Sequence, residues 1–181
     1  MDFQHVTLAA LFFLVAALYS SVGHAGASGY LAAMALLGFA PEQMRPTALA
    51  LNILVGGIGL FRFHKAGLVP WLKVLPFVLA SIPAAYLAAQ WKVPRETYSM
   101  LLGGLLAAAA VGAWHSGDKI AQNGESLASK PIPWPAALFT GALIGCLSGI
   151  TGTGGAIFLT PLLLAMAWAH TREASGLSVA F

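Results

Sequence analysis

Long apolar runs constrain this chain more than any other feature of its sequence. Runs of about 17 to 21 residues, such as 5–21 and 72–90, carry no acidic residue, and a helix needs about this length to cross a hydrocarbon core. No strand-length segment alternates as a membrane barrel requires. With 59% hydrophobic and 8% charged residues, the chain also lacks the polar side chains that cover a soluble domain. The sequence therefore predicts an all-α integral membrane protein, a polytopic helical bundle that crosses the cell (plasma or inner) membrane several times.

Composition also argues against several other classes of protein. The single cysteine, Cys146, excludes an intramolecular disulfide and a multi-cysteine metal site. The nine Lys and Arg residues form no polybasic run, so we expect no nucleic-acid partner. The five histidines show no metal-ligand spacing, and nothing calls for a cofactor. An intramembrane enzyme would need a nucleophile with its base, or a metal cluster, and the apolar runs hold no acid. We therefore predict a protein that is not an enzyme.

Two small-residue breaks interrupt the apolar runs. The first, 23–29, reads G-H-A-G-A-S-G, and the second, 148–155, reads S-G-I-T-G-T-G-G. Glycine lets another backbone approach closely and leaves backbone N–H groups open to a ligand. In membrane transporters, helices broken in this way commonly form the substrate site.

The two breaks belong to two similar halves. When the chain is shifted by 128 positions (148 minus 20), Ser20 falls on Ser148, Gly26 on Gly154 and Leu36 on Leu164. The hydropathy and the breaks match at the same offset. We predict two homologous membrane repeats, 1–115 and 134–181, joined by a polar linker at 116–133. The repeats are inverted if all five segments of the first half cross the membrane, and parallel if one of them is a re-entrant hairpin.

Charges in the predicted loops suggest an orientation. The loop 62–73 holds Arg62, Lys65 and Lys73 but no acid, which favours the cytoplasmic side. The outer loops then hold Arg45, Lys92 and Arg95. Nothing in the second half matches the stretch 54–114, so we expect this chain to be a truncated form that lacks about two or three helices of the second repeat.

The sequence around the breaks resembles a known family. The segments V-G-H-A-G-A-S-G-Y-L-A and T-G-T-G-G-A-I-F-L-T-P-L-L-L, with P-E-Q-M-R-P-T-A-L-A-L-N and T-R-E-A-S-G-L-S after them, resemble the TauE/SafE sulfite exporter family, also called the toluene sulfonate uptake permease family. The resemblance covers nearly all of the chain except the linker. It departs from the family pattern at Ala27 and Ser28, where glycine is more usual, and the first copy has His24 and Ala33 where the second has Gly152 and Pro161.

The resemblance implies a secondary transporter of small sulfur-containing anions, such as sulfite or sulfonates, driven by an ion gradient. A buried oxyanion needs fixed donors, and helix N-termini supply them. We therefore predict that the substrate lies at the paired breaks. The candidate residues are Gly23, His24, Gly26, Ser28, Asn52, Thr151, Gly152, Thr153, Gly154 and Gly155.

Each candidate also has a purely structural interpretation. The glycines can serve helix packing, and the threonines can bond back to their own helix. His24 and Asn52 can bond across helices. At the level of function, an anion channel and an accessory membrane subunit without transport activity remain alternatives. The expected partners are a small anionic substrate, the lipid bilayer and a coupling ion, either proton or sodium. The sequence does not define the oligomeric state.

Overall fold

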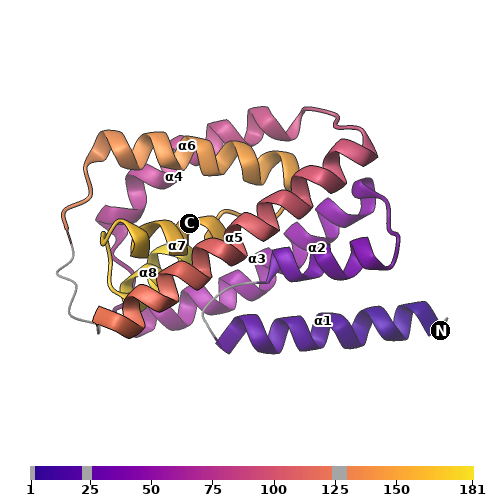
Figure 1. Cartoon of the computed structure of the whole chain (residues 1–181), viewed down its shortest axis with the longest axis horizontal. Coiled ribbons are helices and arrows are strands. Elements are labelled where there is room, and N and C mark those ends of the chain that lie inside the picture. The colour runs from indigo at the N-terminus through magenta and orange to yellow at the C-terminus, as the bar shows by residue number, and fades with distance from the viewer. Residues whose placement is uncertain (1–2, 22–25, 124–129) are drawn as a thin grey trace.

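The computed structural model describes residues 3–21, 26–123 and 130–181, and within these ranges all regular secondary structure is helical (Figure 1). The confirmed fold class is an all-α membrane protein with interrupted helices. Eight helices lie in these ranges: α1 (Phe3–Ser21), α2 (Ala27–Leu36), α3 (Pro41–Lys65), α4 (Trp71–Ala89), α5 (Arg95–Asn123), α6 (Trp134–Thr151), α7 (Ala156–Ala165) and α8 (Thr171–Ala180).

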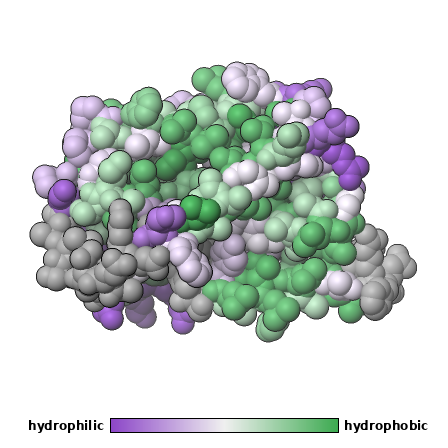
Figure 2. Space-filling view, viewed as in Figure 1, coloured by the Kyte–Doolittle hydropathy of each residue, from purple (hydrophilic) through white to green (hydrophobic). Residues whose placement is uncertain are grey.

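The surface of the bundle is that of a protein in lipid. Among the described residues, α3, α4 and α6 are long and apolar enough to cross a membrane. Large apolar side chains such as Ile53, Leu72 and Phe139 are exposed on these helices. Hydrophobic side chains cover the middle of the face in Figure 2, while hydrophilic ones gather toward the two ends of the long axis. An apolar patch of this extent on a folded chain indicates a surface that meets lipid or another chain.

Three helix boundaries differ from the sequence prediction. Proline suits the first position of a helix, so the sequence predicts a helix over 47–61 that Pro46 opens. Helix α3 instead begins at Pro41, which occupies the first helical turn, and Pro46 lies inside the helix. Helix α5 continues to Asn123, eight residues into the stretch expected to be a solvated linker, because extending an existing helix costs little. The polar residues His170, Arg172 and Glu173 predict a short turn from the sequence, but Arg172 and Glu173 lie in the first turn of α8 and His170 caps it.

Helices α4 and α6 form the most extensive helix–helix contact in the described part of the chain. Gly141, Gly145 and Gly149 of α6 recur every four residues and face the backbone of α4. A Cβ built at Gly145 would lie 2.5 Å from the carbonyl oxygen of Ser81, and one at Gly149 would overlap the carbonyl oxygen of Ala85. Glycine is needed here because only its missing side chain lets the two backbones approach so closely.

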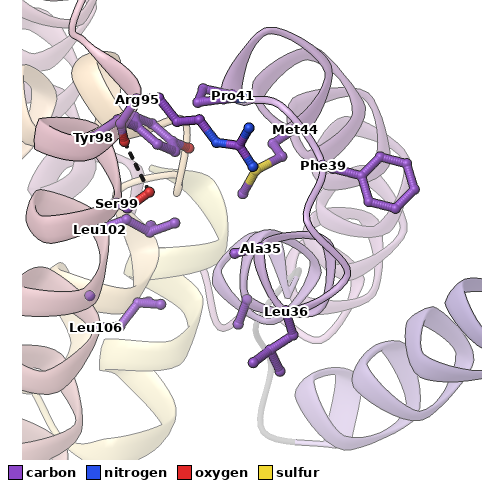
Figure 3. A pocket seen from close by; sticks show the side chains of 12 residues that line it. Ala35, Leu36, Phe39, Pro41, Met44, Arg95, Tyr98, Ser99, Leu102 and Leu106 are labelled. Atoms are coloured by element: carbon purple, nitrogen blue, oxygen red, sulfur yellow. Dashed lines mark hydrogen bonds between the residues drawn. The ribbon is translucent and has the colours of Figure 1, made fainter.

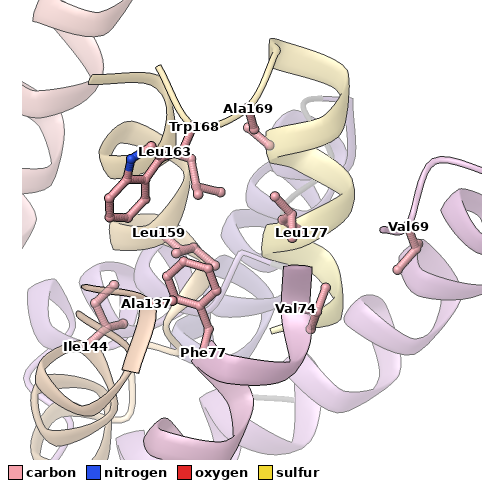
Figure 4. Close-up of a cluster of buried hydrophobic side chains, with 11 residues drawn as sticks. Val69, Val74, Phe77, Ala137, Ile144, Leu159, Leu163, Trp168, Ala169 and Leu177 are labelled. Atoms are coloured by element: carbon pink, nitrogen blue, oxygen red, sulfur yellow. The ribbon is translucent and has the colours of Figure 1, made fainter. Parts of the chain in front are cut away.

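Two buried clusters hold the bundle together. One joins α4, α6, α7 and α8, and Figure 4 shows Phe77 beside Leu159 and Trp168 within it. The ring centroids of Phe77 and Trp168 lie 6.4 Å apart. The other cluster joins α2, α3 and α5 through Tyr30, Leu31, Met34, Met44, Ala48, Tyr98 and Leu102. Each short helix that follows a break is therefore packed against longer helices.

The helices that lead into the two breaks run in opposite directions. In Figure 1, α1 runs from right to left and α6 from left to right. The ten-residue helices α2 and α7 then return toward the end from which α1 and α6 start. The N–H of Lys130 donates to the carbonyl of Ala167 at 2.8 Å, which joins the segment before α6 to the loop after α7. Opposite directions are what an inverted repeat requires, and the repeat itself stays a prediction.

Candidate functional site

The second break is a loop shaped by glycines with left-handed backbone. Gly152 caps the C-terminus of α6 with φ 74°, and Gly154 has φ 73°. Gly155 returns to right-handed values and precedes α7. At the first break, Gly26 has φ 89° and precedes α2. Residues that carry a side chain rarely adopt these positive φ values. The glycines predicted to interrupt the helices therefore also define the backbone conformation where α2 and α7 begin.

Gly154, Asn52 and Ala27 meet in the middle of the bundle. A Cβ built at Gly154 would lie 2.8 Å from the amide nitrogen of Asn52 and 4.0 Å from the Cβ of Ala27. Asn52 lies in the middle of α3, and Ala27 is the first residue of α2. The structure therefore brings the second break, the start of α2 and the predicted polar residue of α3 to one place.

Several hydrogen-bond donors at or next to this meeting point are unused in the described part of the chain. Within the described ranges, no hydrogen bond is found for the backbone N–H groups of Gly154, Gly155 and Ala156, nor for the side-chain amide of Asn52. Successive N–H groups in a left-handed then right-handed turn form a concave anion-binding shape. The N-terminus of a helix adds roughly half a positive charge. Two helix starts and one side-chain amide therefore lie together at the second break.

The predicted hydroxyl ligands are used within the protein. Thr151 Oγ1 donates to the carbonyl of Leu147 at 2.7 Å and lies 2.9 Å from Thr153 Oγ1. Because the Thr151 proton goes to Leu147, Thr153 is the donor in this pair. Ser28 Oγ donates to the hydroxyl of Tyr19 at 3.1 Å. All three hydroxyls belong to buried residues. Thr151 bonds back to its own helix, as the structural interpretation allowed, whereas Thr153 bonds to Thr151 and Ser28 bonds to α1.

The remaining predicted residues have separate surroundings. A Cβ at Gly155 would overlap the ring of Phe181, so this glycine makes room for an aromatic side chain. A Cβ at Gly26 would lie 3.3 Å from the ring of Tyr30. Gly23 and His24 lie outside the described residues. In the ranges that the structure describes, no three His, Cys, Asp or Glu side chains come together as a metal site would need.

The sequence analysis missed Arg45 as a candidate site residue. Its guanidinium carbon lies 4.9 Å from the centroid of the Tyr98 ring. Its stem packs on the second break, where a Cβ at Gly152 would lie 3.2 Å from Arg45 Cγ. The Tyr98 hydroxyl donates to the carbonyl of Thr151 at 2.8 Å, which ties α5 to the end of α6. Arg45 was counted as a loop charge because the contact with Gly152 spans more than half of the chain.

An apolar groove begins at Tyr98, the residue that contacts Arg45. It has a cavity volume of about 390 Å³ and lies between α5 and the junction of α2 with α3. Figure 3 shows Tyr98 and Leu102 on one wall and Ala35 and Met44 on the other. None of the predicted site residues lines it. The groove is therefore distinct from the meeting point of Gly154 and Asn52.

An all-helical bundle with an apolar girdle and two interrupted helices that meet near its centre is a membrane protein of the transporter class. The chain belongs to the TauE/SafE sulfite exporter family, since residues 8–181 match the family described as Sulfite exporter TauE/SafE.

Comparison with curated proteins supports the same class. The chain is 40% identical over 181 residues to the "Probable membrane transporter protein y4hK" of Sinorhizobium fredii (strain NBRC 101917 / NGR234). The alignment covers 100% of this chain and 73% of that relative. No solved structure matches the chain. The predicted family membership and membrane-transporter class are therefore confirmed, while the substrate and the site remain predictions.

Proposed function

We propose that this protein is a secondary transporter of small sulfur-containing oxyanions, such as sulfite or sulfonates, in the cell membrane. Its family supports this substrate class, because the family description names sulfite export. The observation that carries the proposal is the contact of Gly154 with Asn52 and Ala27, which places two helix starts around one amide group.

The proposed site works by replacing water with fixed donors. An oxyanion that leaves water must exchange its hydration shell for hydrogen bonds, because an unpartnered charge in a low-dielectric interior is very costly. The N–H groups that begin α7, the start of α2 and the amide of Asn52 supply these bonds without a fixed positive charge. A site of this kind holds the anion loosely enough to release it.

The predicted residues take different roles in this proposal. Asn52 donates to the anion, and Gly154 leaves the space in which the anion lies. Thr151, Thr153 and Ser28 hold the backbone of the two breaks. Gly23 and His24 stay predictions from the sequence. Alternating access then consists of the two halves of the bundle moving about the anion site.

The experiment uses the purified chain in proteoliposomes. We expect labelled sulfite to accumulate above its equilibrium level when a proton or a sodium gradient is imposed, because a secondary transporter couples two fluxes. A protein that only equilibrates sulfite under both gradients is a channel. Absence of sulfite and sulfonate flux from correctly inserted protein would contradict the proposal.

A further inference from the structure

Arg45 has a buried donor without a partner. Its Nε is shielded from solvent and has no hydrogen-bond partner among the described residues. The ion pair found in those residues joins Lys73 to Glu173, so it does not neutralise Arg45. An unpaired donor of a charged group is costly to bury, because it has lost its bonds to water. A ligand that pairs with this guanidinium would remove the cost.

The surroundings hold the guanidinium in place. The ring of Tyr98 lies beneath it at 4.9 Å, and the same tyrosine is fixed by its bond to the carbonyl of Thr151. The carbonyl of Thr151, at the end of α6, thus accepts its hydrogen bond from Tyr98 and not from Arg45. Gly152 leaves space for the arginine stem. The side chain is therefore positioned by packing, with a planar set of N–H donors of the kind that suits oxyanions.

Arg45 and Asn52 lie on one face of α3. They are seven residues apart, which is two helical turns and about 10 Å, so their side chains leave the same face. Gly152 packs on Arg45, and Gly154 lies against Asn52. Two glycines of the loop between α6 and α7 thus each lie against one of the two polar residues of α3.

We propose that Arg45 is an anion-binding residue at the mouth of the transport path, where it captures a small oxyanion before the anion reaches Asn52. The mouth is at the end of the bundle where Arg95 donates to the carbonyl of Gly38 at 3.2 Å. Sequence charges predict that this end faces outward. The inference rests on the proposed function for the path, but the binding step at Arg45 is separate from transport.

The shift by 128 positions that aligns the breaks also aligns Arg45 with Glu173. Glu173 lies 2.6 Å from Lys73 in the first turn of α8. One of the two matched positions therefore carries a neutralised pair, while the other carries a cation whose Nε has no partner among the described residues. The two matched positions therefore differ in chemistry, and only the Arg45 position offers an unpaired donor to an anion.

The test measures both binding and flux with the full chain. The melting temperature of detergent-purified protein is recorded with sulfite, sulfate, methanesulfonate or chloride, for wild type and for Arg45→Gln, Arg45→Lys and Lys92→Gln. Lys92 is exposed and precedes α5 at the same end, so Lys92→Gln removes an equal charge away from the proposed site. Sulfite flux is measured in parallel as a function of sulfite concentration.

We expect oxyanions to raise the melting temperature of wild type and Lys92→Gln, but not of Arg45→Gln. We also expect Arg45→Gln to raise the KM for sulfite about tenfold, the effect of losing one charge-assisted hydrogen bond, with the maximal rate within about twofold. Arg45→Lys should lie between wild type and Arg45→Gln, because it keeps the charge and loses the planar donors. If Arg45→Gln does not fold, the Arg45→Lys comparison decides.

Two outcomes would overturn the inference. One is an equal oxyanion effect on melting temperature in wild type and the Arg45 variants, and the other is the absence of any such effect in wild type. Oxyanion binding that depends on Arg45, without flux in wild type, would contradict the proposed function and support the inference. Sulfite flux in wild type with an unchanged KM in Arg45→Gln would support the proposed function and contradict the inference.

Discussion

Asn52 and Gly154 lie so close that a single methyl group on Gly154 would be 2.8 Å from the Asn52 amide nitrogen. Real Cβ atoms essentially never come within 3.0 Å of such an atom, so Asn52 would have to move to make room for the methyl group. The contact joins the middle of the longest candidate membrane span to the loop that begins α7. It defines the proposed anion site more directly than any other pair of residues.

The first prediction concerns Gly154→Ala. The new methyl group would push Asn52 away, and alanine at φ 73° costs about 1–2 kcal/mol in backbone strain. We expect sulfite flux to fall about tenfold or more, as the loss of one charge-assisted hydrogen bond implies, while the protein still inserts. Flux in proteoliposomes and the amount of inserted protein are measured together.

Gly67→Ala is the matched control for backbone strain. Gly67 has φ 70°, and a Cβ there would meet nothing within 4 Å. It should lose about as much stability as Gly154→Ala and keep its flux. Equal flux in both variants would show that Gly154 serves only to shape the backbone.

The second prediction concerns the contact of α4 with α6. Gly145→Ala places a methyl group against the carbonyl oxygen of Ser81, which only a shift of one helix can relieve. We expect a loss of about 1–3 kcal/mol in the free energy of unfolding, measured by thermal or denaturant unfolding in detergent. Gly103→Ala in α5 meets nothing within 4 Å and should be neutral or slightly stabilising. A stable Gly145→Ala variant would contradict the close helix contact.

The helices and their breaks could be predicted from the sequence because they depend on local composition. A run of apolar residues of membrane-crossing length predicts a helix, and glycine clusters such as the one at 152–155 predict its interruption. The positions of Gly154 and Asn52 in the site were proposed on the same basis. Their contact could not be derived, since it joins residues that are far apart in the chain.

The role of Arg45 and the use of the hydroxyls could not be predicted for the same reason. Arg45 is partly exposed and only its Nε is shielded from solvent, and the sequence does not show this or that Arg45 packs against Gly152. Whether Thr151 faces a ligand or its own helix depends on one rotamer, which no sequence pattern fixes. The helix start at Pro41 was missed because Pro41 and Pro46 satisfy the same positional preference.

The third prediction concerns Tyr98→Phe. The variant leaves the carbonyl of Thr151 without its 2.8 Å hydrogen bond in a buried place, while the ring beneath Arg45 remains. We expect a loss of about 1–3 kcal/mol in the free energy of unfolding and little change in oxyanion binding. The exposed Tyr86 of α4 provides the control, and Tyr86→Phe should leave stability unchanged. Equal stability of the two variants would show that the Tyr98 bond contributes nothing.

The fourth prediction concerns the ion pair of Lys73 with Glu173. Both side chains are partly exposed, so a double-mutant cycle with Lys73→Met and Glu173→Gln should give a coupling energy of only about 0.2–1 kcal/mol. The coupling should decrease at high salt, because ions screen exposed charges. A coupling that is large and independent of salt would indicate a pair shielded from water.

The most direct measurement of the central claim compares the initial rate of labelled sulfite entry into proteoliposomes for wild type and Asn52→Asp. The substitution keeps the shape of the side chain, removes its N–H donors and adds a negative charge at the meeting point of α2, α3 and α7. The account predicts that wild type transports sulfite and that Asn52→Asp, inserted in equal amount, loses at least about 99% of this rate, since like charges at close range cost several kcal/mol. Equal rates for the two proteins would contradict the claim that the anion passes between these helix starts.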